Sequence, residues 1–227
     1  ELFGFYPGSF IGNPDLEPYN SWNYDASLEF YPSELSVLSA GVFYKDIEDF
    51  IFLQTFDDFS FGGQTFDEAT IAENGDSANV MGVELNYQQH FGFLPSPFDG
   101  LLVSVNYTYV DSDAEVNGRD ISFPKQSDNI AGFVIGYEKY GLDLRLAMSY
   151  RDSYLDELVD EGLDRITDER TQWDFTAKYS VTDNWLVYAE ISNLNDEPEY
   201  YYAGSSSRVL QYDEYGTTTV IGVQYIY

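Results

Sequence analysis

Apolar and polar residues alternate with a period of two along most of the chain, and this pattern constrains the fold more than any other feature. In the segment SWNYDASLEFY, Trp22, Tyr24, Ala26, Leu28 and Phe30 share one side and polar residues occupy the other. Successive side chains point to opposite faces of a β-strand, whereas an amphipathic helix repeats its apolar positions every three or four residues. The same alternation predicts nine strands, at residues 22–30, 38–44, 81–87, 101–109, 131–137, 142–150, 171–179, 185–191 and 221–227.

Short and long links alternate between the nine predicted strands. The short links fall at residues 32–34, 91–100, 139–141 and 181–184. The long links carry 23 of the 40 Asp and Glu residues and fall at residues 56–76, 111–127, 151–169 and 193–216. Successive links of an antiparallel sheet leave from opposite ends, so the long acidic links gather at one end. This segregation is typical of an up-and-down transmembrane β-barrel.

Aromatic side chains occupy both ends of the apolar face, and aliphatic side chains fill its middle. The aromatic residues near the long links are Trp22, Tyr44, Tyr109, Tyr150 and Trp173. Those near the short turns are Phe30, Tyr87, Tyr137, Tyr179 and Trp185. Rings with an apolar body and a polar tip favour the two interfaces of a bilayer. We therefore predict an all-β fold, an antiparallel transmembrane barrel whose apolar face contacts lipid. A soluble β-sandwich is the alternative; it explains the alternation but not the two groups of aromatic residues at the ends of the apolar face.

Charge and composition exclude several functions. The formal net charge is -30, with only 10 Lys and Arg residues, so nucleic acid is not a predicted partner. The chain has no cysteine and one histidine, His90, beside a short link, so we predict no cofactor, no metal centre and no Cys–His or Ser–His nucleophile. An enzyme is not predicted. The acidic run 152–169 is expected to stay hydrated, with divalent-cation binding as the alternative.

Nine strands are too few for a closed bacterial barrel. The edges of an open sheet would leave backbone groups unpaired in lipid, and bacterial single-chain barrels have an even number of strands. The chain also begins with ELFGFYPGSF, which lacks an initiating Met. We therefore expect residues 1–227 to be part of a longer protein whose other strands lie N-terminal to them.

Several segments resemble the TonB-dependent outer-membrane receptors. NPDLEP, at residues 13–18, matches the NPxLxP pattern of that family. The segments that follow in the family's order are AGVFYKDIEDFI (40–51), ANVMGVELNYQ (78–88), VNYTYVDS (105–112) and ISNLNDEPEYYY (191–202). The resemblance implies a barrel of about 22 strands, of which residues 1–227 form the C-terminal portion. It also implies that a plug domain and the N-terminal barrel strands lie outside this sequence.

The resemblance further implies active uptake of a scarce nutrient across the outer membrane of a Gram-negative bacterium. An oligosaccharide or a ferric siderophore is the expected substrate, and the TonB complex would act through the plug. Other implied partners are outer-membrane lipid and lipopolysaccharide, the barrel-assembly machinery and a surface lipoprotein. Two alternatives remain: a plugless diffusion porin, and a soluble or surface-displayed carbohydrate-binding β domain.

Three groups of residues are candidates for function. Cationic, amide and aromatic side chains near the long links could bind substrate, although the rings could equally pack the loops together: Arg151, Arg170, Gln172, Phe59, Phe61, Tyr154, Tyr200, Tyr201 and Tyr202. Polar side chains on the other face of the strands are expected to face the lumen or the plug: Asp25, Glu29, Glu84, Asn86, Arg145, Asp174 and Lys178. The alternating C-terminal residues resemble the signal read by the barrel-assembly machinery: Ile221, Val223, Tyr225 and Tyr227.

Overall fold

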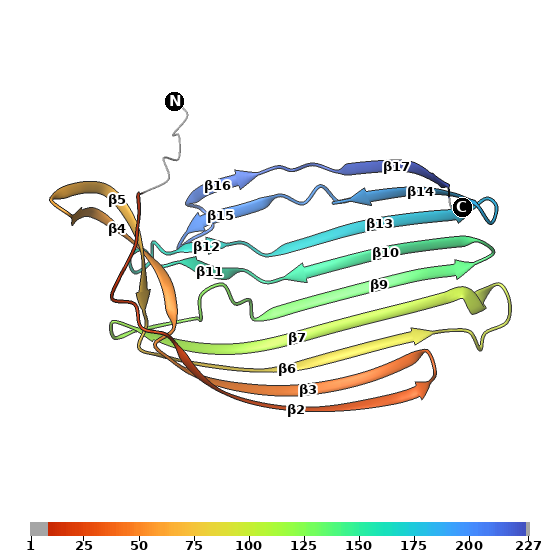
Figure 1. Ribbon diagram of the computed structural model, residues 1–227, viewed down its shortest axis with the longest axis horizontal. Coiled ribbons are helices and arrows are strands. Elements are labelled where there is room, and N and C mark those ends of the chain that lie inside the picture. Colours follow the sequence, from red (N-terminus) through yellow and green to blue (C-terminus); the bar gives the residue numbers. More distant parts are fainter. Residues whose placement is uncertain (1–8, 226–227) are drawn as a thin grey trace.

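The computed structural model describes residues 9–225, and its main element is a curved antiparallel sheet of nine long strands (Figure 1). Long strands that are consecutive in the sequence pair with each other, from β2 at one edge to β17 at the other, which is up-and-down topology. The long strands are β2 (Asn20–Ser33), β3 (Ser36–Glu48), β6 (Ser77–His90), β7 (Leu101–Val116), β9 (Asn129–Lys139), β10 (Leu142–Arg151), β13 (Arg170–Ser180), β14 (Trp185–Ser192) and β17 (Thr218–Tyr225). All nine predicted strands are confirmed; residues 226 and 227 of the last lie outside the described residues.

The two ends of the sheet differ, as the link lengths predict. The short turns lie at one end of the sheet and the long links at the other (right and left in Figure 1). Several strands run past the apolar stretch toward the long links; β7, predicted to end at residue 109, continues to Val116 because its backbone stays paired with β6 as far as Ser77. Within residues 9–225 the one helical element is the 3₁₀ turn Phe98–Gly100, and no helix is long and apolar enough to cross a membrane.

The strand register places the apolar residues of neighbouring strands side by side. Ala26 lies opposite Val42, and Val42 lies opposite Val83. At the turn end, Trp185 lies opposite Tyr225 with ring centroids 4.9 Å apart. Such cross-strand pairs stabilise one face of a sheet. The apolar side chains therefore form one continuous outward face, which is the predicted lipid face.

Glycines on the opposite, inward face make room for large neighbours. Gly82 lies directly opposite Phe43, and a Cβ at Gly82 would sit 2.4 Å from the Phe43 ring. Gly222 is related in the same way to Tyr188, at 2.3 Å. An aromatic ring that packs over a glycine on the next strand shields the backbone of that glycine, which has no side chain to do so. The inward face is therefore closely packed at these points.

The long links are not simple polar loops, and this corrects the expectation drawn from their acidity. One link contains the hairpin of β4 (Ile51–Phe61) and β5 (Gln64–Asn74), to which β1 (Ser9–Ile11) adds in parallel. Strand β8 (Arg119–Ile121) extends the main sheet beside β7. A second loop sheet consists of β11 (Tyr154–Glu157), β12 (Arg165–Thr167), β15 (Glu199–Ala203) and β16 (Val209–Asp213). Pairing satisfies backbone groups that a folded loop would otherwise bury without partners.

A hydrophobic cluster, here called the loop core, lies among these links. Phe50 is 2% exposed, and its ring centroid is 5.2 Å from that of Phe123 and 5.9 Å from that of Phe52. The cluster joins three links to the ends of the long strands; its buried members are Ile47, Phe50, Phe52, Ala78, Val80, Val110, Ala114, Val116, Ile121, Leu155 and Leu158. The run 152–169, expected to stay hydrated, therefore contributes two buried leucines as well as eight acids.

Candidate functional site

The second loop sheet adjoins the ends of β10 and β13 and gathers several predicted binding residues. Tyr154 pairs with Thr167 across β11 and β12, and Thr167 pairs with Tyr201 across β12 and β15. Residues paired in one row share a face of the sheet. Tyr154 and Tyr201 therefore flank Thr167 on one face, next to the points where β10 ends and β13 begins.

Two arginines face each other at that junction. Arg151, the last residue of β10, is paired with Arg170, the first residue of β13. Like charges directly opposite each other destabilise a sheet unless other groups compensate them. Arg170 Nη1 donates to Glu199 Oε1 at 2.6 Å, whereas Arg151 Nη1 donates to the Asp168 carbonyl at 3.0 Å. Within residues 9–225, Arg151 forms no ion pair, so its charge remains available to a ligand.

Aromatic rings support the guanidinium groups of this cluster. The Arg151 guanidinium lies 5.0 Å from the centroid of the Tyr154 ring. Arg165 lies 4.6 Å from the centroid of Tyr201 and forms an ion pair with Asp156 at 3.1 Å. Cations are attracted to ring faces, and stacking also fixes the orientation of the planar guanidinium. The cluster presents fixed N–H donors beside aromatic surface, which suits a ligand that carries rings and oxygen acceptors.

A cavity of about 450 Å³ lies beside this cluster. Its walls include Tyr154, Tyr202, Asp128 and the ion pair between Arg119 and Asp164. Asp164 is buried and also accepts a hydrogen bond from the Val159 backbone N–H at 3.1 Å. The ion pair thus joins the β7–β8 hairpin to the link before β12 and stabilises one wall of the cavity.

Burial and nearby carboxylates change the acidity of the loop tyrosines. Burial, followed by the charge of Glu199, raises the pKa of Tyr201 to about 12. Burial, followed by the charge of Asp168, raises the pKa of Tyr202. Both side chains therefore stay protonated to higher pH than an ordinary phenol and can donate hydrogen bonds, as Tyr201 does to Glu199 Oε2 at 3.1 Å.

The predicted substrate-binding residues divide into a gathered set and a separate set. The gathered set is Arg151, Arg170, Tyr154, Tyr200, Tyr201 and Tyr202. Gln172 lies two residues after Arg170 on β13, and its side-chain N–H donates to Asp174 Oδ1 at 2.9 Å. Phe59 and Phe61 belong to the β4–β5 hairpin, where Phe59 packs with Phe56 and a small cluster around Ile11. In the described part of the chain, neither phenylalanine makes a ring or cation contact with the gathered set.

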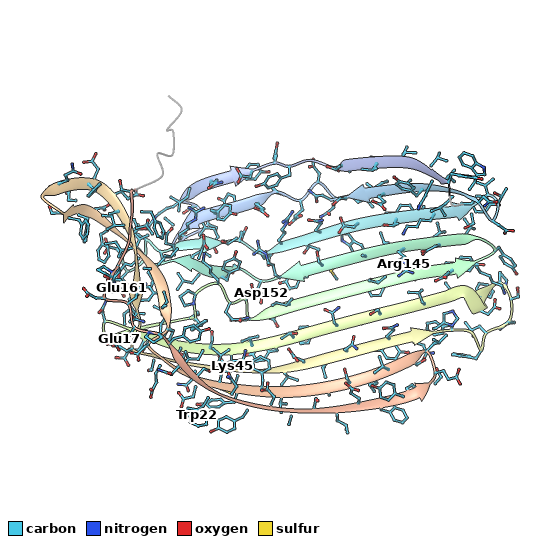
Figure 2. All side chains as sticks on the ribbon, viewed as in Figure 1. Glu17, Trp22, Lys45, Arg145, Asp152 and Glu161 are labelled. Carbon is cyan, nitrogen blue, oxygen red and sulfur yellow. The ribbon has the colours of Figure 1, made fainter. Side chains whose placement is uncertain are left out.

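The predicted lumen-facing residues share the inward face of the long strands, and several are held by polar contacts. Arg145 pairs with Asp143 at 2.9 Å on β10 (labelled Arg145 in Figure 2). Asp174 accepts hydrogen bonds from the Ser192 hydroxyl and the Asn193 backbone N–H at 3.0 and 2.9 Å, so it fixes the start of the β14–β15 link. The remaining members lie on β2, β6 and β13: Asp25, Glu29, Glu84, Asn86 and Lys178.

Three residues predicted to belong to the assembly signal, Ile221, Val223 and Tyr225, lie on the outward face of β17. Ile221 and Val223 are 79% and 62% exposed, and Tyr225 stacks on Trp185. Tyr227 lies outside the described residues.

Sequence reasoning missed the loop core and the side chains that it positions. Phe50 and Phe52 lie in FIFL, residues 50–53, an apolar run at the edge of an acidic link that could have indicated buried packing. Phe123, Leu155 and Leu158 lie in segments where polar residues interrupt the apolar ones at every second or third position, so they form no comparable apolar run. Among residues 9–225, no group of three or more His, Cys, Asp or Glu side chains is arranged to hold a metal ion.

Comparisons with known proteins agree with this architecture. A family model described as "TonB dependent receptor-like, beta-barrel" matches residues 1–194. The vitamin B12 transporter BtuB of Photobacterium profundum is 28% identical over 215 residues, which are 95% of this chain and 32% of that protein. This chain thus spans about a third of that relative's length.

Solved structures show the same fold. The copper transporter OprC gives a TM-score of 0.64 at 17% identity, over 92% of this chain and 32% of that one. The siderophore receptor PirA from Acinetobacter baumannii gives 0.62 at 17% identity, over 95% of this chain and 33% of that one.

The family consists of receptors and transporters in the outer membrane of Gram-negative bacteria, which is therefore the location of this chain. The extent of the family match, together with nine up-and-down strands that separate short turns from long links, establishes that the chain belongs to the TonB-dependent receptor family as part of its β-barrel.

Proposed function

We propose that the chain is the C-terminal portion of the barrel of an active outer-membrane transporter, gated through TonB. The observation that carries this proposal is the family match over residues 1–194. In the complete protein, a plug domain and further barrel strands would complete the lumen, and the TonB complex would act through the plug.

The gathered cluster is proposed to contact the substrate from the outer side. Arg151 supplies a cation without an ion-pair partner in the described chain, and Tyr154 supplies the ring beneath it. Stacked guanidinium and phenol groups bind ligands with rings and oxygen acceptors, a description that fits a ferric siderophore, a corrinoid or an oligosaccharide. Relatives named as a vitamin B12 transporter and a siderophore receptor support the first two classes.

Uptake by the full-length receptor tests the proposal. A strain that lacks its own copy would express the receptor with or without functional TonB, and uptake of labelled ferric siderophores, vitamin B12 and oligosaccharides would be measured. Accumulation of one class only when TonB functions is the expected result. Equal accumulation without TonB would contradict gated transport and support a diffusion porin.

A pair of variants addresses the role of the cluster. Arg151→Gln should reduce uptake at limiting ligand concentration, because it removes the available cation from the Tyr154 ring. Arg208→Gln is the matched control, because exposed Arg208 contacts the Gly162 carbonyl, outside the cluster. Equal uptake by both variants would contradict the proposal that the cluster binds the substrate.

A further inference from the structure

A second cavity, of about 350 Å³, lies on the inward face where β2 and β3 approach the long links. Lys45 projects from β3 on the same face as Ile47, at the end of the sheet that carries the long links (Figure 2). The lining residues used below are Ser21, Asn23, Lys45, Phe50, Ile51 and Phe123. None of the residues that line this cavity is acidic.

This lining combines a lysine with no acid, although the chain has 40 Asp and Glu residues and only 10 Lys and Arg residues. The cavity of about 450 Å³ described above is lined by Asp120, Asp128 and Asp164. A negatively charged ligand group would therefore meet three carboxylates and one paired cation, Arg119, in that cavity, whereas this one offers a cation and no carboxylate. Buried or confined like charges repel strongly, so the two cavities differ in the ligand charge that they accept.

Lys45 has no carboxylate partner in the described part of the chain. Its cross-strand neighbours are Asn23 on β2 and Val80 on β6, both uncharged. Asp25 follows two residues after Asn23 on the same face but forms no ion pair with Lys45 within residues 9–225. The nearest recorded partner of the ammonium group is the Phe43 ring, 5.5 Å from Nζ to centroid.

Part of the cavity lining is aromatic and is held in place by packing. The Phe50 and Phe123 rings are inclined by 51° and belong to the loop core. Ile51 adds an exposed aliphatic side chain, and Ser21 and Asn23 add polar groups on the β2 side. A rigid apolar wall facing an ammonium group matches a molecule with a ring at one end and an anionic group at the other.

We propose that this cavity is a subsite for a ring-bearing carboxylate, with the carboxylate on Lys45 and the ring against Phe123 and Ile51, which the buried Phe50 supports from behind. The subsite deepens the proposed function by naming a chemical class for part of the transported ligand. The Asn23 side-chain N–H donates to a carboxylate oxygen that Lys45 leaves free, and the Ser21 hydroxyl, which donates to Asn23 Oδ1 at 3.0 Å, orients that amide. The absence of acids from the lining makes the subsite selective for anionic over neutral or cationic rings of the same shape.

Binding of matched probes to the full-length receptor tests the subsite. The probes are 2-naphthoate and its neutral analogue 2-naphthylmethanol, titrated calorimetrically into detergent-solubilised receptor with the micelle blank subtracted. Lys45→Met should weaken 2-naphthoate about tenfold, because it removes one charge-assisted hydrogen bond. The same variant should change 2-naphthylmethanol by less than about twofold.

Two further variants keep the test decisive. Ile51→Trp places a larger side chain in the cavity and should weaken both probes, whereas Arg208→Gln removes a distant cation and should weaken neither. No saturable binding of 2-naphthoate to the wild-type receptor would overturn the proposal. Equal loss of both probes in Lys45→Met, or an unchanged affinity for 2-naphthoate, would also overturn it. The binding assay needs no TonB, so its failure is distinguishable from failure of TonB-dependent uptake.

Discussion

The loop core makes a quantitative prediction about how the outer links move. Phe50→Ala would remove a ring that is 2% exposed and packs on Phe52 and Phe123. The Phe50 ring also covers Gly75, where a Cβ would lie 2.3 Å from it. Truncating a fully buried phenylalanine costs about 3–5 kcal/mol, because apolar burial is lost and a cavity remains.

The substitution should lower the free energy of opening of the links rather than the free energy of unfolding of the whole barrel. The links are joined across the core: the Thr55 N–H donates to the Leu158 carbonyl at 3.0 Å, and the Lys125 N–H donates to the Leu155 carbonyl at 2.7 Å. The long strands are held by their own ladders, which Phe50 does not enter. Residues 49–76, 117–128 and 152–169 should therefore open together.

Hydrogen–deuterium exchange of the full-length receptor measures this opening. A loss of about 3–5 kcal/mol corresponds to a decrease in amide protection on the order of 10²–10⁴-fold in the three links. Phe61→Ala is the matched control, because that ring is 51% exposed at the hairpin tip and should change protection little. A decrease of less than about tenfold, or an equal decrease across the long strands, would refute the loop core as a separate cooperative unit.

Other perturbations follow from the same contacts. Gly222→Val should lower the stability of the folded barrel by about 1–3 kcal/mol, because the added side chain would overlap Tyr188. The heat-modified migration of the receptor on gels measures this loss, and migration equal to that of the wild type would contradict the close packing at Gly222. A hydrogen bond from the Tyr150 hydroxyl lowers the pKa of Asp152; burial partly opposes this effect and a hydrogen bond from Asn129 adds to it. Ionised Asp152 therefore stabilises the link fully above the ordinary carboxyl pKa, and this stabilisation is lost as the pH falls through the lowered pKa. Proteolysis of residues 152–169 should accelerate in strongly acidic buffer, and Asp152→Asn should remove that acceleration; a wild-type rate independent of pH would argue against this role.

The sequence predicted the barrel wall well because the wall obeys a single local rule. Each long strand meets lipid on one face, so its apolar residues recur every second position and its aromatic residues mark the two interfaces. The residues of β10, from Leu142 to Arg151, illustrate this agreement, since the predicted span 142–150 differs from it by one residue. Link lengths then determined which ends of the strands gather together.

The links were predicted less well because their order comes from tertiary contacts. Phe50, Phe123 and Leu155 lie far apart in the sequence, in three different links, and become a core only when those links meet. Tyr154 and Tyr201 were recognised as candidates, but their position on either side of Thr167 depends on the pairing of β12 with both β11 and β15. Lys45 gave no signal, since its distinction is the lack of an acidic partner in space rather than any local motif.

Nitroxide scanning of β10 in the full-length receptor, reconstituted in lipid, tests the barrel-wall assignment most directly. The chain contains no cysteine, so each single-cysteine label has a unique position within it. We expect high oxygen accessibility at Leu144, Leu146 and Met148, with low values at Asp143 and Arg145, which occupy the alternate positions. Equal accessibility along β10, or maxima at Asp143 and Arg145, would contradict a wall with one face in lipid and the other toward the lumen.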